Sequence, residues 1–491
     1  MKLTELICRA GLPADPEIAG LTADSRQVQT GFLFVAFAGT RLDGRAFAAD
    51  AVARGARAIL TDRADRLSLP PEARQSVAII EDADPQRRLA VTAARFYKRQ
   101  PHTIAAVTGT NGKTSVVHFL REIWTALGHS SASLGTLGLV APDGRRSGAL
   151  TTPDPVALHR DLAALAKSGV EHAAIEASSH GLAQHRLDGV SVSAAAFTNL
   201  TRDHLDYHRD MAHYRAAKER LFTDLLTAHG TAVLNADSDE FARLARLCRD
   251  RGHPVLAYGI AAGGELRLLS RQPHGAAQAL GIEVLGRRRE LMLPLAGEFQ
   301  AMNALCALGL ALATGAEADA ATAALADLTA VPGRMQFVAR ARQGGAIVVD
   351  YAHTPDALAT VLAALRPHAP GRLVVLFGCG GDRDPGKRPM MGEVAARLVD
   401  LVYVTDDNPR NEDAAAVRRA ILAGAPGAVE IGDRRRAIET AIDALGPGDL
   451  LVIAGKGHET GQIVGDLTLP FDDAAIARET AGQFPLWEVL Q

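Results

Sequence analysis

The residues with the clearest chemistry lie in the run Val107–Ser115, which reads Val-Thr-Gly-Thr-Asn-Gly-Lys-Thr-Ser. Two glycines, Gly109 and Gly112, allow backbone N–H groups to close around phosphate oxygens. Lys113 is placed to reach the outer phosphates, and the Thr114 hydroxyl can ligate Mg²⁺. We therefore predict a nucleoside triphosphate site formed by Gly109, Thr110, Asn111, Gly112, Lys113, Thr114 and Ser115.

The spacing of this run departs from the usual phosphate-binding loop, which has four residues between its first glycine and the Gly-Lys pair. Here only Thr110 and Asn111 stand between Gly109 and Gly112. The alternative is a glycine-rich turn that merely connects a strand to a helix. Gly-Lys-Thr at such a junction favours phosphate binding, because packing alone gives no reason for this combination.

Three polar residues of the middle of the chain are further candidates. Glu176 directly follows the apolar run 172–175, where a carboxylate can bind Mg²⁺ beside Thr114; the alternative is a helix-capping or salt-bridged glutamate. His204 stands next to Asp203 and is a candidate metal ligand, the alternative being a surface or core histidine. Lys218 lies in an amphipathic helical pattern whose spacing alone predicts a solvated lysine.

Two loops of the last third carry polar residues of mixed charge. In Asp407-Asn408-Pro409-Arg410 the planar guanidinium suits a carboxylate, whereas the alternative is a plain turn because Asn-Pro favours turns. The run Gly378-Cys379-Gly380-Gly381 resembles part of a dinucleotide-binding motif. The third glycine of that motif would fall at Arg383, and this excludes a dehydrogenase.

Strands and helices must position these residues. The apolar run 103–107 is typical of a short buried strand, and the apolar positions from Val116 to Leu127 recur at helical spacing. Both features flank the glycine-rich run. A strand over 194–197 also ends in a polar segment, 198–204, so we expect its polar end to face the phosphate-binding turn.

The last third repeats one pattern of an apolar run followed by a polar loop, with helical patterns between the repeats. This pattern predicts a parallel sheet with crossover helices, whose ligands bind beyond the carboxyl ends of the strands. We expect the loops to line one crevice suited to a zwitterionic ligand. The predicted strands are 346–349, 373–377, 401–404 and 450–454.

A chain of 491 residues is too long for a single core, and its length predicts about three domains. A Pro-Gly break lies in the segment Val331–Arg334. We predict an α/β protein with a small N-terminal α/β domain (1–98), a central phosphate-loop domain built on a parallel sheet (99–333) and a C-terminal Rossmann-like domain (334–491).

The composition excludes several classes of protein. Hydrophobic residues make up 47% and charged residues 22%, and the net charge of −3 gives no reason to expect a nucleic-acid or membrane partner. Cys8, Cys248, Cys306 and Cys379 form no CxxC pair, which argues against a disulfide framework or a zinc site. Because the segment Met1–Leu6 lacks a signal-peptide core, and no uncharged run approaches the roughly 18 residues of a membrane span, we expect a cytoplasmic enzyme.

Taken together, these motifs resemble the Mur ligases, the ATP-dependent amino-acid ligases of bacterial cell-wall precursor synthesis. The resemblance covers essentially the whole chain. The Asp407–Arg410 and Gly455–Glu459 loops are specific to the branch that adds 2,6-diaminopimelate to UDP-N-acetylmuramoyl-L-alanyl-D-glutamate (UDP-MurNAc-L-Ala-D-Glu). The segments that match in order are 108–115, 176–180, 199–206 and 214–218.

The resemblance implies Lys113, Glu176, His204 and Lys218 as the catalytic residues. Thr114 and Glu176 would hold one Mg²⁺. Lys218 would be carboxylated by CO₂, and the carbamate would hold a second Mg²⁺ together with His204. The resemblance further implies that Asn303, Arg334 and Asp350 contact the base and ribose of ATP, with Gln300 standing where the family commonly has asparagine.

The resemblance also implies the substrates, which are UDP-MurNAc-L-Ala-D-Glu, meso-diaminopimelate and ATP, and a reaction that passes through an acyl phosphate. We expect a monomer. The UDP end of the precursor would contact Ser25, Thr40, Arg41 and Leu42, and its muramoyl-dipeptide arm Thr151, Thr152, Ser178, Gln184 and Arg186. Diaminopimelate would contact Arg383, Asp407, Asn408, Pro409, Arg410, Gly455 and Glu459.

Two kinds of rival function remain at this point. Within the superfamily they are a folylpolyglutamate synthetase and a lysine-adding ligase, and the Asp407–Arg410 loop and the region of Ser25 argue against both. Outside it, the rival is a binding module that hydrolyses ATP only to change shape. Such a module would release ADP without needing diaminopimelate.

Overall fold

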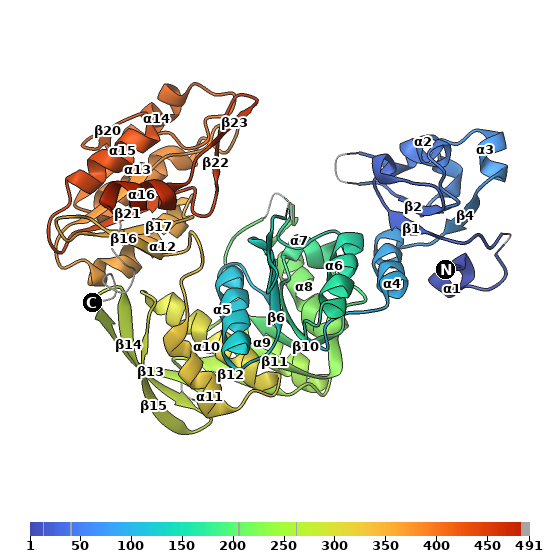
Figure 1. Ribbon diagram of the computed structural model, residues 1–491, viewed down its shortest axis with the longest axis horizontal. Helices are drawn as coiled ribbons and strands as arrows, with labels where there is room; N and C mark the ends of the chain where they lie inside the picture. Colours follow the sequence, from blue (N-terminus) through green and yellow to red (C-terminus); the bar gives the residue numbers. More distant parts are fainter. Residues whose placement is uncertain (13, 40–41, 149, 205–206, 262, 483–491) are drawn as a thin grey trace. The chain divides into compact units, whose positions relative to one another are not determined.

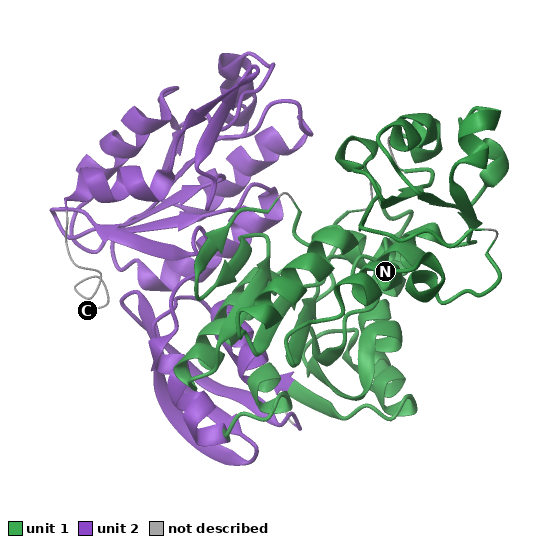
Figure 2. Cartoon of the chain, turned by 45° about the vertical axis from the view of Figure 1, so that its right-hand side comes forward, with its two compact units in different colours: residues 1–257, 309–317 green, residues 258–308, 318–491 purple. Residues whose placement is uncertain are grey.

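The structure is a computed structural model that describes residues 1–491 except 13, 40–41, 149, 205–206, 262 and 483–491. The chain divides into two compact units, coloured separately in Figure 2. Unit 1 comprises Met1–Ala257 and Gly309–Glu317, and unit 2 comprises Tyr258–Leu308 and Ala318–Gln491.

The N-terminal part of unit 1 is a parallel sheet in the order β1-β2-β3-β4 with helices on both faces (Figure 1). Apolar residues of α1 and α4 pack on one face, and Ala48 and Ala51 of α2 pack on the other. The elements are α1 (Leu3–Ile7), β1 (Gly20–Thr22), η1 (Ser25–Gln27), β2 (Phe32–Ala36), η2 (Gly44–Phe47), α2 (Ala48–Ala53), β3 (Ala58–Thr61), η3 (Ala64–Arg66), α3 (Pro71–Gln75), β4 (Ala78–Glu81) and α4 (Pro85–Tyr97).

The rest of unit 1 contains seven neighbouring strands of an 11-stranded sheet, in the order β11-β10-β5-β9-β6-β7-β8. The strands from β11 to β6 pair in parallel, and β7 and β8 pair antiparallel. The elements are β5 (Thr103–Thr108), α5 (Lys113–Ala126), β6 (Ser131–Gly135), β7 (Gly138–Ala141), β8 (Gly144–Arg146), α6 (Pro155–Lys167), β9 (His172–Glu176), α7 (Ser179–Ala183), β10 (Val192–Phe197), α8 (Met211–Arg220), η4 (Leu221–Leu225), β11 (Leu226–Asn235), α9 (Phe241–Asp250) and β12 (Val255–Gly259).

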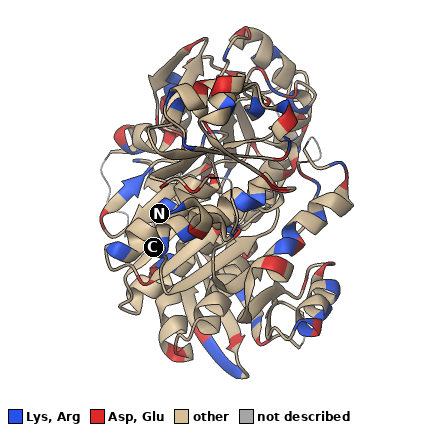
Figure 3. Cartoon of the chain, turned by 90° about the vertical axis from the view of Figure 1, so that its right-hand side faces the viewer, with Lys and Arg blue, Asp and Glu red and all other residues tan. Residues whose placement is uncertain are grey.

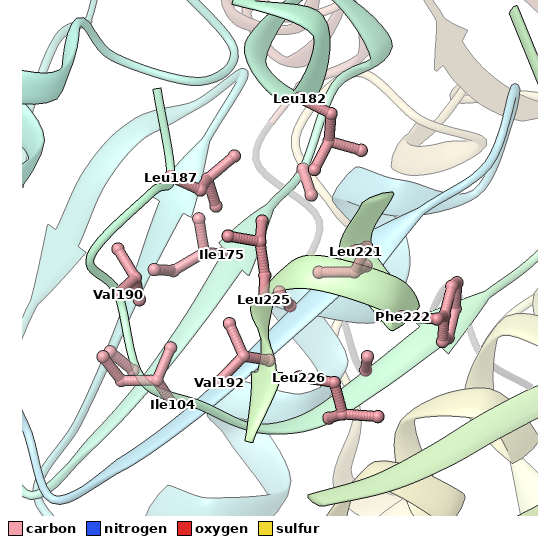
Figure 4. Packing of buried hydrophobic residues seen from close by; sticks show 14 of the residues in the cluster. Ile104, Ile175, Leu182, Leu187, Val190, Val192, Leu221, Phe222, Leu225 and Leu226 are labelled. Atoms are coloured by element: carbon pink, nitrogen blue, oxygen red, sulfur yellow. The ribbon is translucent and has the colours of Figure 1, made fainter. Parts of the chain in front are cut away.

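The core of this sheet explains its apolar strands. Every residue of β5 is buried, as expected for a parallel strand covered on both faces. On one face, Ile104, Ile175 and Val192 of the strands pack against Leu221 and Leu225 of η4 (Figure 4). Helix α5 contacts β6 and β9. The packed strands therefore form a rigid base for the loops at their carboxyl ends.

The first part of unit 2 is an antiparallel meander, β13-β14-β15, followed by helices. Its elements are β13 (Leu266–His274), β14 (Ala277–Val284), β15 (Arg287–Leu293), α10 (Glu298–Ala313), α11 (Ala318–Ala323) and η5 (Ala324–Asp327).

The C-terminal part of unit 2 is a sheet in the order β16-β17-β21-β18-β19-β20, parallel except for β16. Helices α12, α13 and α14 cover one face, and α15 and α16 cover the other. The elements are β16 (Gln336–Arg340), β17 (Ala346–Asp350), α12 (Pro355–Leu365), η6 (Arg366–His368), β18 (Leu373–Phe377), α13 (Lys387–Leu398), β19 (Leu401–Val404), α14 (Ala414–Leu422), β20 (Val429–Glu430), α15 (Arg434–Asp443), β21 (Leu450–Ala454), β22 (Gly461–Val464), β23 (Leu467–Pro470) and α16 (Asp473–Ala481).

The predicted fold class is confirmed, since the sheets are predominantly parallel and carry crossover helices. The predicted strands of the last third correspond to β17, β18, β19 and β21, and they lie side by side in one sheet. Helix α4 ends at Tyr97, and the Val331–Arg334 turn precedes β16. The boundaries between the three predicted domains stay a prediction.

Charged residues of both signs are scattered over the elements, as Figure 3 shows. This distribution fits the small net charge of −3. Among the described residues, no helix combines the length and the apolar character that crossing a membrane requires.

Candidate active site

The phosphate-binding turn follows the carboxyl end of β5. Gly109 has φ 145° and Gly112 has φ 86°, a region that favours glycine, and a Cβ on Gly109 would collide with Thr198 Oγ1. Helix α5 begins at Lys113, so its N-terminal N–H groups lie at the turn. The turn therefore has the backbone that an anion site requires, although it is shorter than the usual loop.

A second segment, after β10, closes around this short turn. Thr198 Oγ1 donates to Asn111 O at 2.6 Å, and Asn111 N donates to Asn199 Oδ1 at 2.9 Å. Thr110 N donates to Asn199 O at 2.9 Å. The polar end of β10 thus faces the turn, as predicted. No role was predicted for the side chains of Thr198 and Asn199, because only their three-dimensional contacts reveal one.

Lys113 and Lys218 both reach the same carbonyl oxygen. Lys113 Nζ donates to Gly109 O at 2.9 Å and to Thr110 O at 2.7 Å, and Lys218 Nζ donates to Gly109 O at 2.7 Å. The side chains of two lysines thus converge on one carbonyl of the turn, and Lys113 gives the turn positive charge. Such a site suits the outer phosphates of a nucleotide.

The prediction of a solvated Lys218 from its spacing is wrong. The side chain is 1% exposed, and its Nζ lies 4.4 Å from the centroid of the Tyr214 ring. Burial, with a smaller contribution from nearby Lys113, lowers the pKa of Lys218 well below its ordinary value. This lowering favours the neutral amine of Lys218, which is the nucleophilic form of a lysine.

Glu176 ends β9 and is 1% exposed. Its Oε2 accepts from Thr114 Oγ1 at 3.0 Å, and its Oε1 accepts from Thr136 N at 2.7 Å. A Cβ on Gly135 would lie 2.6 Å from Glu176 Cδ, so only glycine leaves room for this carboxylate. A hydroxyl and a carboxylate in contact form the all-oxygen donor set that Mg²⁺ prefers, so these residues fit the predicted ion.

His204 lies at the surface with φ 53°, and its Nε2 is 3.5 Å from Asp203 Oδ2. Its ring centroid is 4.9 Å from that of His180 and 6.3 Å from that of Tyr214. The structure thus brings His204 and Lys218 to the same tyrosine.

The residues predicted for the muramoyl-dipeptide arm contact one another. Thr152 Oγ1 lies 3.0 Å from Ser178 Oγ and donates to Glu176 O at 2.7 Å. Arg186 Nη2 donates to Gln184 Oε1 at 2.6 Å, and Arg186 Nη1 donates to Thr152 O at 2.7 Å. Thr151 Oγ1 lies 3.2 Å from Thr136 Oγ1, which itself contacts Glu176. This polar cluster adjoins the Glu176 carboxylate.

The residues predicted for the UDP end lie in the N-terminal part of unit 1. Ser25 is 7% exposed and begins η1, whose first turn is capped by Asp24. Leu42 is 69% exposed. Thr40 and Arg41 lie outside the described residues. Their contact with the UDP end stays a prediction.

In unit 2, three loops meet around Tyr351. The Arg334 guanidinium lies 4.6 Å from the Tyr351 ring centroid, and a Cβ on Gly457 would come within 2.7 Å of Tyr351 Cβ. Gly333 packs directly on the backbone of Gly457 and His458. The turn that carries Arg334 therefore adjoins the Gly455–Glu459 loop.

Asp350 and Asn303 are the other residues predicted to contact the nucleotide. Asp350 Oδ2 accepts from Met335 N and Oδ1 from Ala352 N, both at 2.7 Å. Burial raises the pKa of Asp350, opposed by Arg334. Asn303 Nδ2 donates to Gln300 Oε1 at 3.0 Å, one turn earlier on α10.

The residues predicted for the third amino acid gather at the carboxyl ends of β19 and β21. Asn408 Nδ2 donates to Glu459 Oε2 at 3.0 Å, and Lys456 Nζ donates to Asn408 Oδ1 at 3.0 Å and to Glu459 Oε2 at 3.2 Å. Asp407 lies against Gly455, where a Cβ would be 2.7 Å from Asp407 Oδ2. Lys456 is fully buried and was not predicted as a site residue, although it stands inside a loop that was.

The arginines of this group differ in their surroundings. Arg410, with φ 52°, follows the buried Pro409 and donates from Nη1 to Gly381 O at 2.7 Å. This bond directs its guanidinium toward the loop after β18. Arg383 in that loop is exposed, and both arginines approach Gly380.

A buried ion pair, Arg434–Asp473, bonds to the backbone of the loops that follow β19 and β21. This pair was not predicted from the sequence. Arg434 and Asp473 are both 0% exposed, with Arg434 Nη2 at 2.7 Å from Asp473 Oδ2. Arg434 also donates to Asp406 O at 3.3 Å and to Ala454 O at 3.0 Å. Since these carbonyls precede Asp407 and Gly455, Arg434 holds the two loops together. The Asp-Arg-Arg-Arg run 433–436 gave no indication of which arginine is buried.

A phosphate-binding turn beside a buried carboxylate, at the carboxyl ends of parallel strands, is typical of nucleotide-binding α/β enzymes. The sequence matches three families: "Mur ligase family, catalytic domain" over residues 17–97, "Mur ligase middle domain" over 107–311, and "Mur ligase, glutamate ligase domain" over 333–457. The chain belongs to the Mur ligase family.

Individual relatives extend over nearly the whole chain. A UDP-N-acetylmuramoyl-L-alanyl-D-glutamate–2,6-diaminopimelate ligase of Bradyrhizobium diazoefficiens is 54% identical, covering 95% of this chain and 96% of the relative. The protein of the same name from Caulobacter vibrioides is 52% identical over 96% of this chain and 97% of its own. A solved structure of a ligase with this name superimposes with a TM-score of 0.75 at 32% identity, covering 98% of both chains.

Proposed function

We propose that this chain is an ATP-dependent ligase that adds meso-2,6-diaminopimelate to UDP-MurNAc-L-Ala-D-Glu in peptidoglycan precursor synthesis. The observation that carries the proposal is the convergence of Lys113, Lys218 and the Thr114–Glu176 pair on the turn around Gly109. This cluster suits transfer of the terminal phosphoryl group of ATP. The relatives named above supply the identity of the substrates.

The first chemical step activates a carboxylate, because a free carboxylate and an amine do not condense in water. A side-chain carboxylate oxygen of the D-glutamyl residue attacks the γ-phosphorus of ATP, the bond to the β-phosphate oxygen breaks, and ADP leaves. Lys113 exchanges its bonds to Gly109 O and Thr110 O for phosphate oxygens and stabilises the charge of the transferred group. The product of this step is an acyl phosphate.

The second step forms the amide bond. The neutral amine of diaminopimelate attacks the acyl carbon, the carbon–oxygen bond to phosphate breaks, and the amine loses a proton as inorganic phosphate leaves. No side chain acts as a nucleophile in either step. Catalysis in this proposal is positioning together with electrostatic stabilisation.

Thr114 and Glu176 are the residues that would hold a first Mg²⁺, and Lys218 with His204 would hold a second. When bound, Mg²⁺ supplies positive charge against the phosphate oxygens. An ammonium group cannot ligate a cation, so Lys218 must first be carboxylated. Its neutral amine attacks CO₂, a nitrogen–carbon bond forms, and one proton is released to give a carbamate with two ligating oxygens.

Arg410 would select the third amino acid. Meso-diaminopimelate differs from lysine by one additional carboxylate, and a guanidinium binds a carboxylate through two parallel hydrogen bonds. With lysine, Arg410 would lose this partner in a desolvated site. A site built to bond a group rejects an analogue lacking it by roughly 10⁴-fold.

We further propose that the enzyme acts in the cytoplasm as a monomer, with the precursor bound by residues 1–98, ATP by 99–333 and diaminopimelate by 334–491. This division assigns each substrate to a part of the chain with its own sheet.

The experiment that tests the proposed function is ATP turnover by the purified chain with UDP-MurNAc-L-Ala-D-Glu and a panel of meso-diaminopimelate, lysine and ornithine. We expect sustained ADP release and a new amide product only with meso-diaminopimelate. Equal ADP release without any amino acid would instead indicate a nucleotide-driven binding module. Preferential turnover of lysine would indicate the lysine-adding branch.

A further inference from the structure

A second group of potential metal ligands lies in unit 1 at the amino ends of the central strands. Among the described residues, His129, Glu171 and His172 form a group in which one ligating atom from each lies within 4.8 Å of the others. His172 begins β9 and pairs in register with Ser131 of β6. His129 stands two residues before Ser131 in the chain. Glu176 ends the same strand β9, so the two ends are separated by about 13 Å at 3.3 Å per residue.

The backbone holds these three residues in place. Glu171 N and His172 N donate to Ser130 O at 2.9 Å and 3.2 Å, which fixes both beside His129. His129 N donates to Trp124 O at 2.9 Å, in the turn that ends α5. A ligand group whose backbone is already fixed loses less conformational entropy when it binds an ion.

The side chain of His172 has an unsatisfied polar atom. It is 9% exposed, and its Nδ1 is buried without a hydrogen-bond partner. Its ring centroid lies 4.3 Å from that of His129. A buried ring nitrogen without a hydrogen-bond partner is available to a metal.

The other two side chains can adjust to an ion. His129 and Glu171 have side chains 39% and 64% exposed, and His129 Nδ1 lies 4.0 Å from Glu171 Oε2. In a tetrahedral zinc site the ligating atoms lie roughly 3.4 Å apart, given metal–ligand distances near 2.1 Å. The ligating atoms therefore need to approach one another by at most about 1.4 Å, which half-exposed side chains can supply.

We propose that His129, Glu171 and His172 bind a divalent transition-metal ion of the zinc class at the amino edge of the central sheet. Two imidazoles and one carboxylate form a ligand set typical of Zn²⁺, with water completing the tetrahedron. Mg²⁺ prefers oxygen ligands alone, so the ion of the phosphoryl-transfer site is not expected here. The bound ion stabilises the folded chain, because it binds the folded state and not the unfolded state. It takes no part in the ligase reaction.

The test measures zinc binding by the full chain without a histidine tag. Protein stripped with a chelator is equilibrated with Zn²⁺ in excess Mg²⁺, and bound zinc is counted by mass spectrometry. The variant is His129→Phe combined with Glu171→Gln, which keeps an aromatic ring against His172 but removes two ligands. The control is His229→Ala, which removes an exposed histidine of the same unit.

We expect the unaltered chain and His229→Ala to bind one more zinc per chain than the double variant, whose affinity at this site falls at least tenfold. Co²⁺ is expected to give the visible absorption of a tetrahedral site in the unaltered chain only. Equal zinc stoichiometry and affinity in the unaltered chain and the double variant would overturn the proposal. Absence of bound zinc in the unaltered chain would overturn it equally and would leave the two histidines as a stacked pair.

Discussion

At the scale of single residues, burial changes the chemistry of Lys218. An ordinary lysine is protonated at neutral pH and repels cations. Removal from water lowers the pKa of this lysine, and its Nζ remains bonded to Gly109 O at 2.7 Å. The same burial therefore keeps the amine next to the phosphate-binding turn and makes it reactive toward CO₂.

Lys218→Ala is expected to lose ligase activity, because no carbamate can form. Added bicarbonate should not restore the variant, whereas short carboxylic acids that fill the space should restore part of the activity. The control is Lys167→Ala, which removes an exposed lysine of α6. Carbon-13 NMR with labelled bicarbonate should detect a carbamate in the unaltered chain and not in the variant. A fully active unaltered chain without this resonance would contradict the assignment.

Lys113→Ala is expected to lower kcat by at least about 10²-fold, because a cation at the transferred phosphoryl group is lost. The fold should persist, since the buried strand β5 and the buried face of α5, which flank the turn, keep their packing. Turnover measured with saturating substrates, beside a circular dichroism spectrum, checks both statements. Near-normal turnover would show that the turn does not serve phosphoryl transfer.

Arg410→Ala is expected to lower the preference for meso-diaminopimelate over lysine, by up to roughly 10⁴-fold. The measurement is the ratio of kcat/KM for the two amino acids. Arg397→Ala, which removes an exposed arginine of α13, serves as the control and should keep the preference. An undiminished preference in Arg410→Ala would assign selectivity to another residue.

At the scale of elements, the carboxyl ends of parallel strands place the site. Several strands could be predicted because buried parallel strands are continuous apolar runs, and their loops could be predicted as sites because such sheets bind ligands there. These strands are β5, β9, β10, β17, β18, β19 and β21. The contacts of Lys218 and Arg434 could not be predicted. Lys218 bonds to a residue 109 positions away and Arg434 to one 39 positions away, and no local pattern encodes such distances.

Gly135→Ala tests how β6 positions the Glu176 carboxylate. The added Cβ would lie 2.6 Å from Glu176 Cδ and would displace it from Thr114. We expect the Mg²⁺ concentration for half-maximal activity to rise by about tenfold or more, because a misplaced ligand weakens metal binding. Gly427→Ala is the matched control, since its Cβ would meet nothing within 4 Å. An unchanged Mg²⁺ requirement in Gly135→Ala would separate Glu176 from the metal.

The Arg434–Asp473 pair provides a stability test of the loops after β19 and β21. Asp473→Ala leaves a buried guanidinium unpaired and should cost about 3–5 kcal/mol. Glu479→Ala removes an exposed pair with Arg435 between the same two helices and should cost less than about 1 kcal/mol. Chemical denaturation measures both. Replacing both members, as in Arg434→Met with Asp473→Leu, should recover most of the loss; equal effects of the two alanine variants would contradict the account.

At the scale of the whole molecule, the proposed reaction couples activation of a carboxylate by ATP to formation of an amide bond. In this proposal the acyl phosphate couples the two steps, because the first step forms it and the amine of diaminopimelate consumes it in the second. The order of steps predicts that one oxygen of the released phosphate comes from the precursor's carboxylate and none from water.

This origin of the oxygen is the most direct test of the central claim. UDP-MurNAc-L-Ala-D-Glu carrying oxygen-18 in its D-glutamyl side-chain carboxylate is ligated to meso-diaminopimelate, and the inorganic phosphate is analysed by mass spectrometry. The account predicts one labelled oxygen in each phosphate when both carboxylate oxygens are labelled. Phosphate without label, formed together with the amide product, would contradict it.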